Sequence, residues 1–167
     1  MILDATCSYG KVWPKHASIR IDVRPECRPD FVMSATDLKF PDHFFDEIYC
    51  DPPHIFRKNP LPPITRIRQR MKSGRLNQDF FRRWGFWKSR ADWFAFLDSV
   101  NREFYRCLKP SGVLHFKMVD GKNSGVTKLS EMTERMTNFT TVKDEYRNSE
   151  SHYGKTVIHW LTMRPKP

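Results

Sequence analysis

The first third of the chain contains several short apolar runs, and each has an aspartate at or near its end. Runs this short, bounded by prolines and polar turns, are typical of buried strands rather than of helices. In an open parallel sheet, ligands bind beyond the carboxyl ends of the strands, so aspartates at those ends are expected to meet in one crevice. The runs span residues 1–4, 19–23, 30–38 and 45–51, and their aspartates are Asp4, Asp22, Asp37 and Asp51.

The middle of the chain changes to a helical period and then returns to a strand. Apolar residues from Trp93 to Leu108 recur at helical spacing, and Ser89 precedes them as a candidate N-cap. Residues 112–119 are almost continuously apolar, as expected of a buried strand, and residues 127–139 predict a second helix. Strands and helices therefore alternate along the chain.

The tail predicts an antiparallel hairpin. Residues 140–147 and 155–163 both have strand patterns, and the polar stretch 149–154 separates them. Together with the alternating elements before it, this hairpin predicts an α/β fold whose sheet is mostly parallel with an antiparallel edge.

One segment carries the whole net charge of the chain, which is +10. Residues 57–90 hold eleven Lys and Arg and one acid, whereas the other 133 residues hold eighteen bases and eighteen acids. A basic block of this kind predicts a polyanionic partner. Its aromatic rings either stack on bases or anchor the core beside the following helix. The 167-residue length predicts a single domain, 1–167, with this segment as an insertion.

Several classes of protein are disfavoured. The opening residues MILDATCSYG lack the basic flank and apolar centre of an export signal, and no apolar run is long enough to cross a membrane. We therefore expect a cytoplasmic protein without a membrane partner. The four cysteines and six histidines show no metal-ligand spacing, so we expect reduced thiols and no metal.

The sequence DATCSYG, residues 4–10, has the pattern of a ligand-binding turn between a strand and a helix. Small residues at Thr6, Ser8 and Gly10 allow backbone amides to face a nucleotide-type ligand. Asp22 follows at the end of the second predicted strand, where a carboxylate can accept hydrogen bonds from both ribose hydroxyls. The alternative is that each aspartate only caps a turn. The pair at this spacing predicts an adenosine-type cofactor.

The sequence Asp51-Pro52-Pro53-His54 is the most specific chemical feature of the chain. The amino group of a base is a poor nucleophile because its lone pair is delocalised into the ring. A carboxylate and a backbone carbonyl that accept its two hydrogens favour tetrahedral nitrogen, and consecutive prolines fix that carbonyl. A flat fourth side chain can stack on the ring. The alternative is a rigid turn that Asp51 caps.

In this order, DATCSYG, Asp22, Asp37-Leu38, DPPH and LKPSGVLHFK resemble class I S-adenosylmethionine-dependent methyltransferases of the Asp-Pro-Pro-Tyr branch. The DPPH variant and the Lys-Thr…His-Trp-Leu tail also resemble small phage-type predicted methyltransferases. The resemblance covers about residues 1–56 and 91–163. It implies a Rossmann-like, seven-stranded sheet of order 3-2-1-4-5-7-6, with S-adenosylmethionine bound over the ends of strands 1 to 3.

The resemblance also implies a role for individual residues. Asp51, Pro52, Pro53 and His54 would form the catalytic turn that faces the target amine. The remaining implied contacts are with the donor: Asp4, Ala5, Thr6, Ser8 and Gly10 at its methionine part, Asp22 and Val23 at its ribose, and Asp37 and Leu38 at its adenine.

The basic segment follows the DPPH turn directly, so we expect it to contact the substrate. A base inside a duplex must be flipped out before its amino group can reach a donor, and a basic loop can hold the flanking backbone. Lys117 lies in an apolar strand and needs a carboxylate such as Asp51 or Asp120. The expected substrate contacts are Phe56, Arg57, Lys58, Arg66, Arg68, Arg70, Lys117, His159 and Trp160.

These features predict N-methylation of a nucleic-acid base, with adenine N6 in DNA as first choice. The same signature occurs in enzymes that act on cytosine N4, on guanine N2 of RNA and on glutamine side chains, and the sequence does not choose among them. A C5-cytosine reaction is disfavoured because Cys50 precedes Asp51 and should point into the sheet. The chain is short for a DNA enzyme, so a second copy or a partner subunit is expected to complete the site. The rival interpretation, supported by Thr6, Ser8 and His54, is a catalytically silent nucleic-acid-binding protein with this fold.

Overall fold

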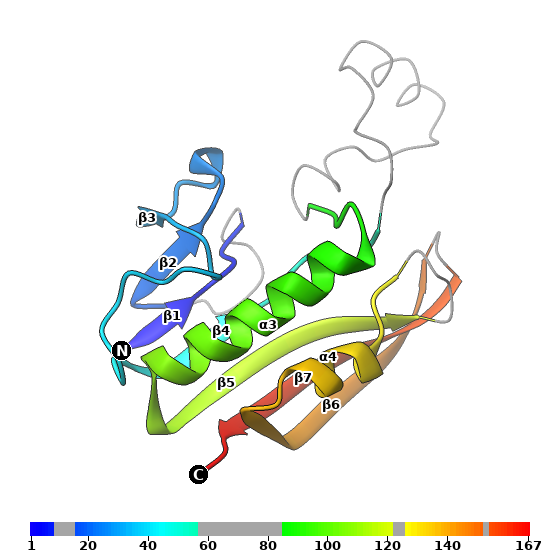
Figure 1. Ribbon diagram of the computed structural model, residues 1–167. Coiled ribbons are helices and arrows are strands. Elements are labelled where there is room, and N and C mark those ends of the chain that lie inside the picture. The colour runs from blue at the N-terminus through cyan, green and yellow to red at the C-terminus, as the bar shows by residue number, and fades with distance from the viewer. Residues whose placement is uncertain (9–15, 57–84, 122–125, 152–153) are drawn as a thin grey trace.

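The described part of the chain forms one seven-stranded sheet with two α-helices (Figure 1). The computed structural model describes residues 1–8, 16–56, 85–121, 126–151 and 154–167. The strands are β1 (Ile2–Asp4), β2 (Ile19–Asp22), β3 (Phe31–Val32), β4 (Phe45–Cys50), β5 (Leu108–Gly121), β6 (Phe139–Ser151) and β7 (Gly154–Pro165). A short 3₁₀ turn, η1, spans Pro25–Cys27.

The strand order is β3-β2-β1-β4-β5-β7-β6, which confirms the predicted order and the predicted fold class. The five strands β3, β2, β1, β4 and β5 are parallel to one another, so their carboxyl ends lie at one edge of the sheet. β7 is antiparallel to both β5 and β6, as the tail pattern predicts. The hairpin therefore forms the edge strand and its neighbour.

Helix α3 (Arg90–Cys107) begins where the sequence places it. The Ser89 side chain accepts a hydrogen bond from the backbone amide of Asp92, which satisfies one of the unpaired donors of the first turn. Trp93, Leu97 and Phe104 recur at helical spacing, are fully buried and pack against the sheet. β5 begins directly at Leu108, four residues earlier than the apolar run alone indicates.

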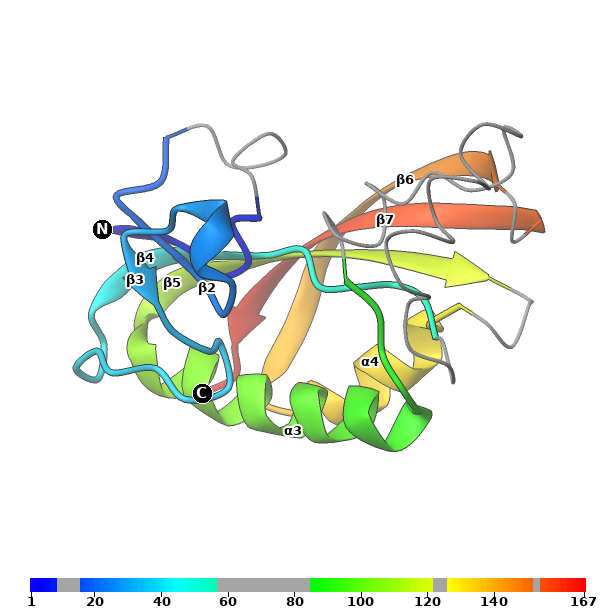
Figure 2. The same ribbon diagram turned by 90° about the horizontal axis from the view of Figure 1, so that it is seen from above.

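Helix α4 (Leu129–Arg135) is shorter than the predicted helix 127–139. Tertiary hydrogen bonds compete with the helix at its end: the Asn101 side chain donates to Thr137 Oγ1 and accepts from the Asn138 amide at 3.0 Å. Both α-helices lie on the same face of the sheet (Figure 2). No helix of the described residues is long and apolar enough to cross a membrane.

The third predicted strand, 30–38, is the largest error in the sequence-based assignment. Only Phe31 and Val32 are paired. After them the chain turns, because the Ser34 carbonyl accepts from the Asp37 amide and the Ser34 and Thr36 hydroxyls are 2.7 Å apart. Asp37 is therefore not at a strand end. Its side chain is 67% exposed and pairs with Lys39 at the surface.

Candidate active site

A cavity of about 540 Å³ lies at the carboxyl edge of the parallel strands. Its volume is in the range of small-molecule and cofactor sites, roughly 300–1,000 Å³. The walls come from the loops after β1, β2, β3 and β4, from the segment before α3 and from the first turns of α3. Among the lining residues are Ala5, Thr6, Ser8, Asp22, Val23, Arg24, Met33, Ala35, Asp51, Pro52, Trp87 and Phe96.

The loop after β1 is tied to both neighbouring strands by Thr6 and Ser8. Thr6 Oγ1 accepts a hydrogen bond from the Asp51 amide at 2.7 Å, which a glycine cannot do. The Ser8 amide donates to Asp22 Oδ2 at 3.0 Å, and Ser8 has a left-handed backbone, with φ 48°. Thr6 and Ser8 therefore shape the cavity wall by means that differ from a glycine-rich turn.

Asp4 lies behind this loop and not in the cavity wall. It is 4% exposed, and its Oδ1 accepts from the Thr6 amide at 3.2 Å. Burial raises the pKa of Asp4 to about 7, since the charged carboxylate loses its hydration and also faces Asp51 and Asp22. In this structure Asp4 supports the loop, and its expected contact with a cofactor stays a prediction.

Asp51 is held at the end of β4 by two cationic or polar partners. Its Oδ1 is 2.9 Å from His54 Nε2, and its Oδ2 accepts from Lys117 Nζ at 2.7 Å. Burial alone would raise the pKa of Asp51, but the His54 hydrogen bond and the Lys117 ammonium outweigh it and hold this pKa below its usual value. Asp51 is therefore an ionised carboxylate at the cavity wall.

The backbone of the DPPH turn is fixed by hydrogen bonds from two distant segments. Trp87 Nε1 donates to the Pro53 carbonyl at 2.6 Å, and the Thr127 amide donates to the His54 carbonyl at 3.0 Å. The Trp87 ring packs on Trp93 and Phe96 of α3. Trp87 is thus both a core anchor and a residue that positions the turn. The sequence pattern did not distinguish Trp87 from the other aromatic residues before α3.

His54 differs from its expected role as a stacking platform. Its ring bonds to Asp51 through Nε2, and only 15% of the side chain is exposed. Its Nδ1 atom is buried and has no hydrogen-bond partner among the described residues. The imidazole therefore orients the carboxylate in this structure rather than presenting a free face to the cavity.

Comparisons with known proteins give structural matches only. No protein-family model matches the sequence, and no curated protein matches it. A SAM-dependent methyltransferase from Methanosarcina mazei is 13% identical and has a TM-score of 0.56, covering 98% of this chain and 91% of that chain. The N-methyltransferase NodS from Bradyrhizobium japonicum is 12% identical, with a TM-score of 0.53 over 99% of this chain and 85% of that chain.

A third match contains a bound cofactor product. It is the 1,6-didemethyltoxoflavin-N1-methyltransferase from Burkholderia thailandensis, with bound 1,6-didemethyltoxoflavin and S-adenosylhomocysteine. It is 12% identical, with a TM-score of 0.57 over 99% of this chain and 71% of that chain. The fold is that of class I methyltransferases. Strand order, parallel core and antiparallel hairpin all agree with it.

Asp22 lies in this class I fold at the end of β2, but its carboxylate is already occupied. Oδ1 accepts from the Arg24 amide and from Arg24 Nε at 3.0 and 2.9 Å. Oδ2 accepts from the Ser8 amide and from Arg24 Nη2, both at 3.0 Å. A carboxylate has about four lone-pair sites. A ribose can therefore bond to Asp22 only after the Arg24 side chain moves.

Other expected site residues lie apart from the cavity. Leu38 is buried in the core, and Asp37 is at the surface. Phe56 packs beside the core under the Arg90 guanidinium, which is 4.7 Å from its ring centroid. These three positions do not line the cavity. Their expected contacts with donor or substrate stay predictions.

The two expected residues of the hairpin have local partners. His159 Nδ1 is 2.9 Å from Asp144 Oδ2, and Arg147 lies over the Trp160 ring at 5.6 Å. Trp160 is paired in register with Lys117, so it is the nearer of the two to Asp51. The expected contacts at Gly10, Arg57, Lys58, Arg66, Arg68 and Arg70 lie outside the described residues.

The cysteines have structural positions. Cys7, Cys27, Cys50 and Cys107 are all buried and free. Cys50 is fully buried in the core, as expected for its position before Asp51, and burial raises its pKa well above its ordinary value. A neutral, buried thiol is a poor nucleophile. This supports the sequence argument against a C5-cytosine reaction.

Proposed function

We propose that the chain is an S-adenosylmethionine-dependent methyltransferase that acts on an exocyclic amino group of a nucleic-acid base, adenine N6 in DNA first. The observation that carries the proposal is that the ionised carboxylate of Asp51 lines a cavity large enough for a cofactor. The loops after β1 to β3 form a cofactor-sized cavity, and Asp51 of the DPPH turn closes its wall. In open α/β sheets, ligands bind at the carboxyl ends of the strands, which is where this cavity lies.

The residues around the cavity fit the methyl donor. Thr6, Ser8, Asp22 and Val23 all line the cavity. We assign the first two to the methionine part of the donor and the last two to its ribose. Met33 and Ala35, which follow β3, offer the apolar wall that an adenine needs and replace Asp37 and Leu38 in that role. The bound donor would supply an electrophilic methyl group.

The chain's own part in the reaction is to bind and activate the amine. Each Asp51 oxygen has one side-chain partner, which leaves a lone-pair site on each for an N–H of the target. Pro52 lines the same cavity, and its carbonyl is the second acceptor that we assign to the amine. Trp87 fixes the turn by holding the Pro53 carbonyl. Lys117 helps to keep Asp51 ionised, so the Asp51 carboxylate accepts hydrogen bonds at neutral pH.

The charge distribution supports a nucleic-acid substrate. The whole net charge of +10 belongs to residues 57–90, and this segment begins immediately after Phe56, next to the DPPH turn. A small neutral substrate gives no reason for such a block, whereas phosphates do.

One observation favours the rival function, a nucleic-acid-binding protein that does not use the donor. Arg24 saturates Asp22, the residue that would take the ribose. Calorimetry with S-adenosylmethionine separates the two proposals. Millimolar donor that gives no heat of binding would exclude the enzyme. If the donor binds, tritiated methyl transfer to duplex DNA, tRNA and rRNA, followed by nucleoside mass spectrometry, identifies the product.

Replacing Arg24 with Ala is expected to tighten donor binding about fivefold. The donor must displace a partly exposed ion pair, which contributes about 1 kcal/mol, and the substitution removes this competition. Calorimetry on wild type and Arg24→Ala measures the change. Arg20→Ala is the matched control, since Arg20 lies on β2 just before Arg24 and pairs with Asp30 outside the cavity. Weaker donor binding by Arg24→Ala alone would show that Arg24 contacts the donor instead.

A further inference from the structure

A second and larger cavity lies beyond the candidate active site, at the free end of the hairpin. Its volume is about 1020 Å³. It is bounded by the end of β5, by the first turns of α4 and by the facing ends of β6 and β7, which lie side by side in Figure 1. We call it the hairpin cavity, and none of its lining residues belongs to the cavity over the β1 to β4 loops.

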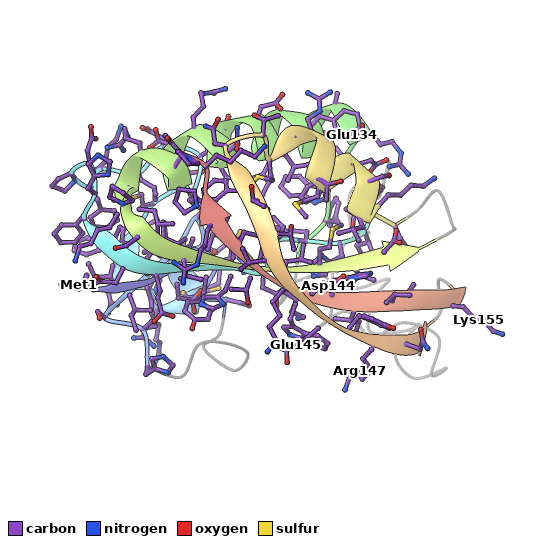
Figure 3. All side chains as sticks on the ribbon, turned by 90° about the horizontal axis from the view of Figure 1, so that it is seen from below. Met1, Glu134, Asp144, Glu145, Arg147 and Lys155 are labelled. Atoms are coloured by element: carbon purple, nitrogen blue, oxygen red, sulfur yellow. The ribbon has the colours of Figure 1, made fainter. Side chains whose placement is uncertain are left out.

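The described lining of the hairpin cavity carries a net positive charge. Lys128, just before α4, and Lys155, at the start of β7, both line it. Figure 3 shows Lys155 at the far end of β7. Neither ammonium makes an ion pair with any described residue. Asp120 is the single acid among the described lining residues, and its Oδ1 already accepts from the Leu129 amide.

Four lysines of the described residues behave differently. Lys39, Lys109, Lys117 and Lys143 each pair with a carboxylate. Lys128 and Lys155 have no such ion pair among the described residues, while Asp120 shares the cavity lining and Glu150 lies opposite Lys155 in the β6–β7 register. Neutral hydrogen-bonding groups surround them, since Ser130, Asn148 and Ser149 also line the cavity. Ammonium groups with hydroxyls and amides are the usual set for phosphate oxygens.

The distance between the DPPH turn and the hairpin cavity indicates which part of a bound nucleic acid the cavity would contact. Cys50, the last residue of β4, pairs with Phe116, and β5 continues for five more residues to Gly121. At about 3.3 Å per residue, the end of β5 lies roughly 16 Å beyond the end of β4. Since duplex DNA rises about 3.4 Å per base pair, this distance equals about five base pairs.

We infer that the hairpin cavity binds the phosphate backbone of the substrate nucleic acid about five base pairs from the target base. The inference rests on the proposed function, because the DPPH turn sets the position of the target. It assigns Lys128 and Lys155 to the flanking duplex. Such contacts fix register and orientation without reading sequence.

The test compares duplexes of different length on wild type and on Lys128→Gln/Lys155→Gln. Each duplex has the target adenine followed by about three or about eight base pairs on one flank, and both flanks are tested, so that only the longer arm reaches the cavity. Fluorescence anisotropy measures affinity against salt concentration. Wild type should bind the long-arm duplex more tightly. The double variant should lose this difference, and its salt slope should fall by about two.

The control variant is Lys109→Gln/Lys166→Gln. It loses the same charge at the opposite edge of the sheet, where β5 begins and β7 ends. It should keep the length dependence. Donor affinity and thermal unfolding, measured on all three proteins, verify that the cavities are intact.

The outcomes separate the inference from the proposed function. A double variant that keeps both the length dependence and the salt slope overturns the inference, while methyl transfer by that variant leaves the function standing. Wild type that binds the donor but shows no length dependence on either flank also overturns the inference alone. Wild type that neither binds the donor nor methylates any nucleic acid overturns both.

Discussion

Replacing Asp51 with Asn is expected to lower the rate of methyl transfer by roughly 10²- to 10⁴-fold, the range for loss of a group that accepts a proton or hydrogen bond in the transition state. The amide oxygen still accepts one hydrogen bond, but the amide nitrogen cannot accept the second and the negative charge is lost. Donor affinity should change much less, because the donor is held mainly by the β1 to β3 loops. Single-turnover transfer of tritiated methyl measures the rate.

The same substitution has a structural cost that the experiment must separate. Lys117 is only 15% exposed, and breaking a largely buried ion pair by removing one partner costs about 3–5 kcal/mol of stability. Transfer is therefore measured well below the unfolding temperature of each variant. A folded Asp51→Asn protein that transfers methyl at the wild-type rate contradicts the assignment of Asp51.

Lys117→Met is the companion variant, because it keeps Asp51 and removes only the cation that positions it. The Lys117 ammonium is one of the groups that hold the pKa of Asp51 below its usual value. Its loss raises that pKa, so activity should disappear at a higher pH as the solution is acidified. A pH–rate profile whose acid limb does not move would show that Lys117 only packs the strand.

Strand ends are the part of the site that sequence reasoning located well. Asp22 and Asp51 both line the cavity because each follows a buried run whose register in a parallel sheet leaves little choice. Asp37 is not at a strand end, because the Ser34–Thr36 turn ends β3 after two residues. Hydroxyl side chains that bond within a turn compete with strand pairing, and a pattern of apolar residues does not record that competition.

The partners of charged groups were harder to foresee than their positions. Lys117 was expected to pair with Asp51 or Asp120, and the register decides between them: Phe116 pairs with Cys50, which brings Lys117 beside Asp51. The pairing of Arg24 with Asp22 has no signal in spacing alone. The hydrogen bond from Trp87 to Pro53 joins residues 34 positions apart, across a basic segment without periodicity. Long-range contacts of single side chains depend on tertiary packing, which local patterns do not encode.

Asp4→Asn is expected to stabilise the protein increasingly as pH rises from about 4 to about 7, by up to about 4 kcal/mol. The unfolded carboxyl has its ordinary pKa of 3.8, and burial raises the folded value to about 7. The folded state thus binds the Asp4 proton more tightly than the unfolded state does. Its contribution to stability is complete below pH 3.8, falls as pH rises and is lost above pH 7. The amide of the variant never ionises, so the variant avoids this loss.

Urea unfolding of wild type and Asp4→Asn at a series of pH values measures the difference. The Asn oxygen can still accept from the Thr6 amide, so the β1 loop is retained. Asp46→Asn is the control: hydrogen bonds from Lys109 and the N-terminus lower the pKa of this exposed carboxyl to about 2, so its titration falls below the window of interest. Parallel stability curves for wild type and Asp4→Asn between pH 4 and pH 7 would show that Asp4 titrates as in the unfolded chain.

A cationic donor in the adjacent cavity favours the ionised carboxylate, so its binding at pH 6 should release protons from wild type and fewer from Asp4→Asn.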